Sequence, residues 1–187
     1  MKVTIREGKK EDAAFIAQGI MDAIGEEICR EIGRNSDNPL LSAKELFTRT
    51  AAEECSQYSY RNALIAEDES GMPAGVAVSY DGSALHLLRE AFVKIYNEMY
   101  DANLREEEFD DETSPDEIYL DTLAVKPEYR GRGLGSQLIA AVEARHAGSG
   151  KPLGLLVDYD NRQARHLYEK IGFGSKGARC FCGVEME

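Results

Sequence analysis

Three glycines alternate with other residues in the second half of the chain, at Gly131, Gly133 and Gly135, and two arginines, Arg130 and Arg132, accompany them. Glycine lets a backbone take positive φ angles and approach a ligand closely. A helix that begins in such a loop points unpaired N–H groups at the space before it and binds anions there. The segment is therefore predicted to hold a phosphate group, mostly through main-chain contacts.

Two common phosphate-binding loops do not fit this spacing. A P-loop ends in Gly-Lys-Ser/Thr, whereas Gly135 is followed directly by Ser136, with no lysine between them. A dinucleotide-binding loop has the pattern G-x-G-x-x-G, and here the third glycine comes one residue early. The strand before the loop also comes too late in the chain to be the first strand of a Rossmann fold. A third kind of phosphate loop is needed.

The strand predicted just before this loop, over 117–125, contains a carboxylate in an otherwise apolar run, Asp121. An unpaired carboxylate there is expensive, so Asp121 is either a paired structural group or a functional one. Alternation places it on one face with Tyr119 and Leu123, unless a bulge breaks the pattern. Glu117 is a second acidic candidate, and it closes an acidic run that begins at Glu106.

Hydrophobic periodicity and turn residues predict the elements that must position these groups. In chain order we expect a strand over 2–6, a helix over 10–32, a helix from the capping box Ser42–Glu45 to about 58, a hairpin turning at 69–73, a helix over 84–100, the strand 117–125, a helix to about 147, a strand over 153–158, a helix over 161–171 and a last strand over 179–186. Strand, crossover helix and parallel strand form a right-handed unit, here within a mixed sheet.

Composition narrows the classes of partner. With 187 residues, 43% of them hydrophobic, the chain is expected to form one domain over 1–187. The net charge of −12 opposes binding of nucleic-acid phosphates and suits a cationic small molecule. No secretory signal is evident and no stretch approaches the roughly 18 apolar residues that span a bilayer. The four cysteines match neither a disulfide framework nor a zinc spacing, so we expect a cytoplasmic protein without a metal or a membrane contact.

Residues 117–173 resemble the core of the GCN5-related N-acetyltransferase (GNAT) superfamily. The resemblance depends on two motifs in the right order: Leu123-Ala124-Val125 followed by Arg130-Gly131-Arg132-Gly133-Leu134-Gly135, and Val157-Asp158 followed by Asn161, Ala164, Leu167, Tyr168 and Gly172-Phe173. It implies an α/β fold with a mixed, mostly antiparallel sheet, a central splayed pair of parallel strands and flanking helices. Residues 82–116 depart from the family pattern as a helical and acidic insertion.

The resemblance implies acetyl-CoA as co-substrate, bound between the two parallel strands. The amides of about Arg132–Ser136 would hold its pyrophosphate, and the backbone of Leu123 and Val125 would pair with the pantetheine arm. The implied cofactor-binding residues are Leu123, Ala124, Val125, Arg130, Gly131, Arg132, Gly133, Leu134, Gly135, Ser136, Asn161 and Tyr168. Two alternatives stay open, since Arg130 also fits a surface cation and Asn161 also fits a helix N-cap.

The activity that the resemblance implies is direct transfer of an acetyl group to a primary amine of a small molecule or a peptide. Asp121, with Glu117 as second candidate, would bind the amine or relay its proton. Tyr168 would give a proton to the departing thiolate, and packing against the neighbouring strand is the alternative for this residue. The alternative is a sensor that binds CoA without turnover. The acceptor, the acyl length and a homodimer stay open. The acidic run 106–117 is interpreted either as a solvated, mobile loop or as a lure for a cationic acceptor.

Overall fold

The computed structural model describes residues 3–181 and 184–187. Within this part, the main sheet has five strands in the order β1-β2-β3-β4-β5, and a separate two-stranded sheet pairs β6 with β7. All neighbouring strands are antiparallel except β4 and β5, which are parallel. The predicted mixed sheet with a parallel pair is confirmed. The strands are β1 (Thr4–Glu7), β2 (Ala63–Glu67), β3 (Pro73–Asp81), β4 (Ile118–Val125), β5 (Leu153–Gly154), β6 (Arg179–Phe181) and β7 (Val184–Met186).

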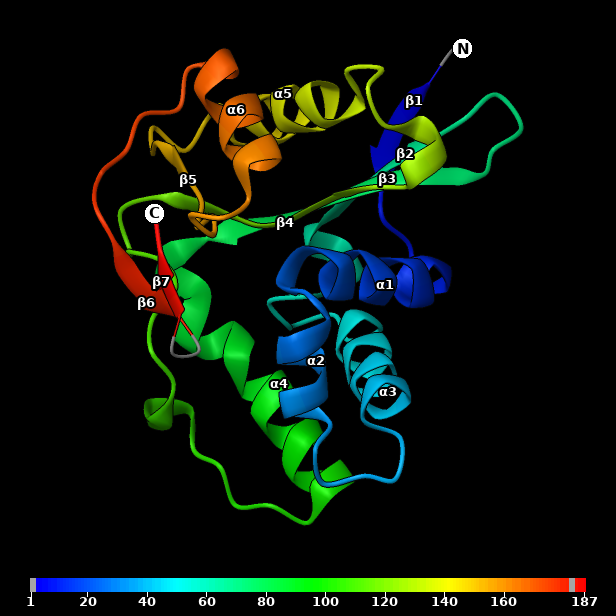
Figure 1. Ribbon diagram of the computed structural model, residues 1–187, viewed down its shortest axis with the longest axis vertical. Helices are drawn as coiled ribbons and strands as arrows, with labels where there is room; N and C mark the ends of the chain where they lie inside the picture. The colour runs from blue at the N-terminus through cyan, green and yellow to red at the C-terminus, as the bar shows by residue number, and fades with distance from the viewer. Residues whose placement is uncertain (1–2, 182–183) are drawn as a thin grey trace.

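Helices cover both faces of the main sheet (Figure 1). One face carries α5 and α6, and the other carries α1, α2, α3 and α4. The helices are α1 (Ala13–Ile24), α2 (Glu26–Ile32), α3 (Pro39–Ala51), α4 (Leu85–Tyr100), α5 (Leu134–His146) and α6 (Arg162–Ile171). Among the described residues, none of the helices has both the length and the apolar character that crossing a bilayer requires.

Two hydrophobic cores lie on the two faces of the sheet. Successive residues of a strand point to opposite faces, so Leu64 packs toward Leu138 of α5 while Ile65 packs toward Ile16 of α1 and Phe47 of α3. Both faces of β2 and β3 are therefore buried, which explains their nearly continuous apolar sequence. The central strands are held rigidly from both sides, and they position the end of β4.

Several predicted elements in the first half of the chain have different limits. Gly25, with φ of +87°, divides the predicted helix 10–32 into α1 and α2. The capping box at Ser42 is wrong: α3 begins at Pro39, and Asn38 caps it by accepting the N–H of Leu41 at 3.3 Å. Proline fits the first position of a helix because its φ is already helical and it has no N–H to satisfy. The Ser42 hydroxyl instead lies 2.8 Å from that of Tyr100.

From the hairpin around 69–73 onward, the structure follows the prediction until the last strands. The helix expected over 84–100 is α4, and the hairpin around 69–73 joins β2 to β3. The strand expected over 153–158 is paired with β4 only over β5, and the last strand is a hairpin of β6 and β7. Residue 2 of the first predicted strand and residues 182–183 of the last lie outside the described residues. That 82–116 is an insertion within one domain stays a prediction.

Candidate active site

The parallel strands β4 and β5 stay together for only two residue pairs, and their pairing ends after Tyr119 and Gly154. Beyond this point Val157 exchanges two backbone hydrogen bonds of 2.9 Å with Glu187 instead. A cavity of about 670 Å³ lies where the two strands diverge. Residues of both sequence motifs line this cavity, so the divergence of the strands brings the two motifs together.

The glycine loop forms one wall of the cavity. Gly131 and Gly133 have φ angles of +72° and +76°, and a Cβ atom at either would meet nothing within 4 Å. Gly133 is the N-cap of α5, and its carbonyl accepts the N–H of Gln137 at 3.1 Å. The N–H groups of the first helical turn have no intrahelical acceptor. Gly135 differs, because a Cβ atom there would lie 3.1 Å from Leu167 of α6, so this glycine allows the two helices to pack closely.

The predicted cofactor residues other than Arg132 line the cavity: Leu123, Ala124, Val125, Arg130, Gly131, Gly133, Leu134, Gly135, Ser136, Asn161 and Tyr168. Arg130 Nε donates to the carbonyl of Val125 at 2.8 Å and so joins the loop to the end of β4. Asn161 caps α6, since its Oδ1 accepts the N–H of Ala164 at 3.1 Å. The capping role of Asn161 is confirmed, and its contact with a cofactor stays a prediction.

Asp121 lies at a bulge of β4. The pairing with β3 skips this residue, because Leu120 and Thr122 face adjacent residues of β3. The extra residue breaks the alternation along the strand, so Leu120 and Leu123 both pack toward α5. The strand thus contains a bulge, which the sequence analysis left open, and the bulge displaces Asp121 from the regular ladder at the cavity wall.

The surroundings of Asp121 favour its protonated form. Its side chain is half-buried, and one oxygen accepts a hydrogen bond from the Thr122 hydroxyl at 2.8 Å. Burial raises the pKa of Asp121 to about 7, the negative charge of Glu112 adds to the rise, and the Thr122 hydrogen bond opposes it. A carboxylate with a pKa near neutrality can both take up and release a proton at pH 7.

Tyr168 of α6 lines the same cavity as Asp121. Its ring packs against Phe173, with the ring centroids 5.7 Å apart. Burial raises the pKa of the Tyr168 phenol to about 12. The phenol therefore keeps its proton at neutral pH and can act as a donor. A carboxyl group on β4 that titrates near neutrality and a protonated phenol on α6 thus share one cavity with the glycine loop.

Residues 41–173 match the acetyltransferase (GNAT) family. The chain belongs to this family. A solved structure described as an acetyltransferase is 30% identical to this GNAT protein, with a TM-score of 0.75, and the alignment covers 98% of this chain and 95% of the other. The predicted superfamily is confirmed.

Two named relatives match a shorter part of this GNAT protein. A putative [ribosomal protein bS18]-alanine N-acetyltransferase of Bacillus subtilis (strain 168) is 38% identical over 65 residues, and a thialysine N-epsilon-acetyltransferase of Bos taurus is 39% identical over 69 residues. Each match covers 34% of this chain, and 43% and 41% of the two relatives. The chain thus spans less than half the length of these relatives.

Glu117 of the GNAT protein does not line the cavity that Asp121 lines. Its Oε1 accepts hydrogen bonds from the Thr113 hydroxyl at 2.8 Å and from the N–H of Ser114 at 2.9 Å. Its side chain borders a different cavity, of about 580 Å³. The geometry gives Glu117 a structural role in the turn before β4 and does not favour it as the base.

Glu112 is a cavity residue that the sequence analysis did not single out. The side chains of Glu107 and Asp110 are exposed, but Glu112 is only 5% exposed and lines the same cavity as Asp121. The interpretation of the acidic run as a solvated, mobile loop is therefore wrong at this position. A signal was present in the sequence: Arg89 falls in line with the apolar residues of α4, and a buried arginine requires a carboxylate partner.

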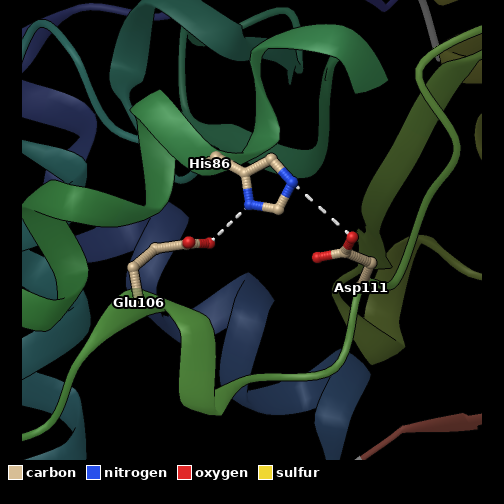
Figure 2. Close-up of side chains that lie close together, drawn as sticks. All are labelled: His86, Glu106 and Asp111. Carbon is tan, nitrogen blue, oxygen red and sulfur yellow. Dashed lines mark hydrogen bonds and ion pairs between the residues drawn. The ribbon is translucent and has the colours of Figure 1, made fainter.

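A second group of titratable side chains lies behind Glu112, away from the glycine loop. Figure 2 shows His86 between two carboxylates, with Nδ1 2.8 Å from Glu106 and Nε2 3.6 Å from Asp111. These three side chains are close enough together to hold a metal ion. However, Arg89 donates to the same two carboxylates at 2.9 and 3.3 Å, so a cation already lies between them. We interpret the group as an ion-pair network, and the expectation that no metal is needed stays a prediction.

Proposed function

We propose that this protein transfers an acetyl group from acetyl-CoA to a primary amine of a small molecule or a peptide. The observation that carries the proposal is that the glycine loop, Asp121 and Tyr168 line one cavity. The two named relatives, one described for a ribosomal-protein alanine and one for thialysine, support an amine acceptor without fixing its size.

The glycine loop fits the pyrophosphate of CoA. The open space at Gly131 and Gly133 lets a ligand approach the backbone, and the first turn of α5 offers N–H groups and the positive end of a helix dipole. We infer that the amides of about Arg132–Ser136 hold the pyrophosphate and that the end of β4, at Leu123 and Val125, lies along the pantetheine arm. Bound acetyl-CoA would supply the acetyl group and a thiolate leaving group.

Asp121 is the proposed base. An alkyl amine has a pKa near 10, and reaching its neutral, nucleophilic form at pH 7 costs about 4 kcal/mol. Asp121, with a pKa of about 7, can take that proton directly or through a water molecule. A carboxylate with an ordinary pKa near 4 would bind the proton about a thousandfold more weakly than Asp121.

Tyr168 is the proposed acid. Its phenol is protonated at neutral pH, and the residue lines the same cavity as Asp121. A phenol that donates a proton to the departing sulfur would prevent a free thiolate from building up in the half-buried site. No covalent bond between the acetyl group and the protein is needed, so transfer is direct.

The test begins with binding. Thermal melting is recorded with acetyl-CoA, CoA and NADH in parallel, because a ligand at 100 times its Kd adds about 2.7 kcal/mol to the free energy of unfolding. We expect both CoA species to raise Tm and NADH to leave it unchanged. Absence of a shift with either CoA species would contradict the proposal.

Turnover is then measured as release of free thiol from acetyl-CoA with a panel of primary amines, including polyamines and lysine-containing peptides. Tyr168→Phe is the matched variant, since it removes the hydroxyl and keeps the ring that packs on Phe173. We expect thiol release with at least one amine and a loss of about 10² in kcat in Tyr168→Phe. A protein that binds CoA and releases no thiol with any of the amines would instead support the sensor.

A further inference from the structure

The acidic segment that follows α4 places one carboxylate at the cavity, outside the two motifs. Glu112 lines the cavity together with Asp121 and Tyr119 of β4, and its side chain is 4% exposed. Burying a carboxylate costs free energy unless it is paired, so we asked which groups pair with Glu112 and what its charge does at the cavity.

Three donors fix the Glu112 carboxylate in place. Arg89 donates to one oxygen at 2.5 Å, while the Tyr80 hydroxyl and the Gln57 side-chain amide donate to the other at 3.0 and 3.2 Å. These donors come from α4, from β3 and from the segment after α3. With both oxygens occupied, Glu112 is held as a carboxylate that cannot rotate away from the cavity.

The positive charge behind Glu112 does not cancel its field. The guanidinium of Arg89, 3% exposed, also pairs with Glu106 at 2.9 Å and with Asp111 at 3.3 Å. One positive charge is thus shared among three carboxylates, and the group keeps a net negative charge, which protonation of His86 reduces but does not cancel. A fixed anion therefore lines the same cavity as Asp121.

We propose that Glu112 is a positioning residue whose fixed negative charge, on the wall of the cavity that Asp121 also lines, assists Asp121 in taking the proton of the acceptor amine. This inference rests on the proposed function, in which Asp121 is the base. It also gives the segment 82–116 a role, because α4 supplies Arg89 and the loop after it supplies Glu112.

The other groups around Asp121 do not replace the charge of Glu112. Tyr119 and Tyr80 are neutral at pH 7, since burial raises the pKa of both phenols well above 10, and the Thr122 hydroxyl donates to Asp121. Tyr58 also lines the cavity wall. The remaining charged or titratable residues of the cavity come from α1, from the glycine loop and from the region of α6: Asp22, Tyr129, Arg130, Asp158, His166, Tyr168 and Lys170. Burial and the negative charge of Glu112 raise the pKa of Asp121, and the Thr122 hydrogen bond opposes the rise.

The test follows the titration of Asp121 itself. Protein labelled with ¹³C at the aspartate carboxyl carbons is titrated by NMR, and Asp121→Asn identifies the resonance. We expect a midpoint near 7 in the wild type and a midpoint lower by about one pH unit in Glu112→Gln. Glu107→Gln is the matched control, because it removes the same charge from the same segment at an exposed position, and it should leave the midpoint unchanged.

Glu112→Asp keeps the charge and withdraws it by one methylene, so its midpoint should lie between those of the wild type and Glu112→Gln. If Glu112→Gln does not fold, the midpoint of Glu112→Asp is compared with that of the wild type instead. In steady-state kinetics, the acidic limb of the pH profile of kcat/KM should move by the same amount as the NMR midpoint, a shift that mere loss of folded protein would not cause.

Equal midpoints in the wild type, Glu112→Gln and Glu112→Asp would overturn the proposal, and so would a wild-type midpoint below about 5. Because the titration needs neither cofactor nor turnover, its outcome is separate from that of the proposed function. If Glu112→Gln lowers the midpoint of Asp121 as expected but the protein does not bind CoA, the result would contradict the proposed function alone.

Discussion

The two ends of the cavity are built from different parts of the chain. The glycine-loop end comes from one continuous segment, and its proposed contacts are backbone N–H groups whose direction is set by Gly131, Gly133 and the start of α5. The acidic end consists of two side chains, Asp121 on β4 and Glu112 in the loop after α4, and Glu112 is held there by residues far earlier in the sequence, such as Arg89 and Gln57. Ligand binding at the first end should therefore depend on local backbone conformation, whereas the chemistry at the second end should depend on individual charges.

The largest expected effect lies at the acidic end. Asp121→Asn should lower kcat/KM for the amine by about 10²–10⁴, because the proposed base is lost while the shape of the side chain is kept. The affinity for acetyl-CoA, measured by calorimetry, should change less than twofold. An Asp121→Asn enzyme within tenfold of wild-type activity would place the base elsewhere and would remove the contrast between the two ends.

The next effect tests the glycine-loop end with two matched glycines. Gly133→Ala and Gly150→Ala both place a Cβ atom at a positive φ, +76° and +69°, with open space around it. Each should cost about 1 kcal/mol of stability. Only Gly133→Ala puts the methyl group in front of α5, so we expect its Kd for acetyl-CoA to rise about tenfold or more while that of Gly150→Ala stays unchanged. An equal change of affinity in both variants would mean that strain, and not closeness to the ligand, matters.

The same contrast explains what the sequence could predict. The glycine loop, the helix after it and β4 are specified by neighbouring residues, so local pattern and motif spacing were enough to predict them. The second parallel strand was predicted over 153–158, but it pairs only over Leu153–Gly154. Asp121 was found because it interrupts an apolar strand, although its bulge depends on the pairing with β3, which local pattern does not contain.

Glu112 could not be found in this way. It stands among many carboxylates, and what distinguishes it is a contact with Arg89 across 23 positions of the chain. Charge composition predicts a solvated segment and carries no information on which carboxylate is buried. The predicted start of α3 was wrong because the sequence offers two capping patterns, and the proline at position 39 favours the earlier one.

Stability should depend on pH in a way that separates Asp121 from an ordinary surface carboxylate. Because its folded-state pKa of about 7 lies above the unfolded value near 4, the native state binds the extra proton between these two pH values. The free energy of unfolding should therefore fall as pH rises from about 4 to 7. Asp121→Asn removes this loss and should be more stable than the wild type at pH 8, by about 4 kcal/mol because the two pKa values differ by about three, but not at pH 4. Denaturant unfolding at the two pH values measures the difference, and equal differences at both would contradict the raised pKa.

The smallest expected effect concerns the exposed part of the acidic run. If the run acted as a lure, neutralising its exposed carboxylates would raise the KM of a cationic acceptor, most strongly at low salt. Glu107 and Asp110 are exposed, and the contact of Asp110 with Arg89 uses its backbone carbonyl, so Glu107→Gln with Asp110→Asn leaves the buried network intact. We expect KM to change less than about twofold at an ionic strength of about 0.15 M, where charges are screened beyond about 8 Å. A severalfold rise at low salt that disappears at high salt would show that the acidic end acts at long range as well as through the fixed charge of Glu112.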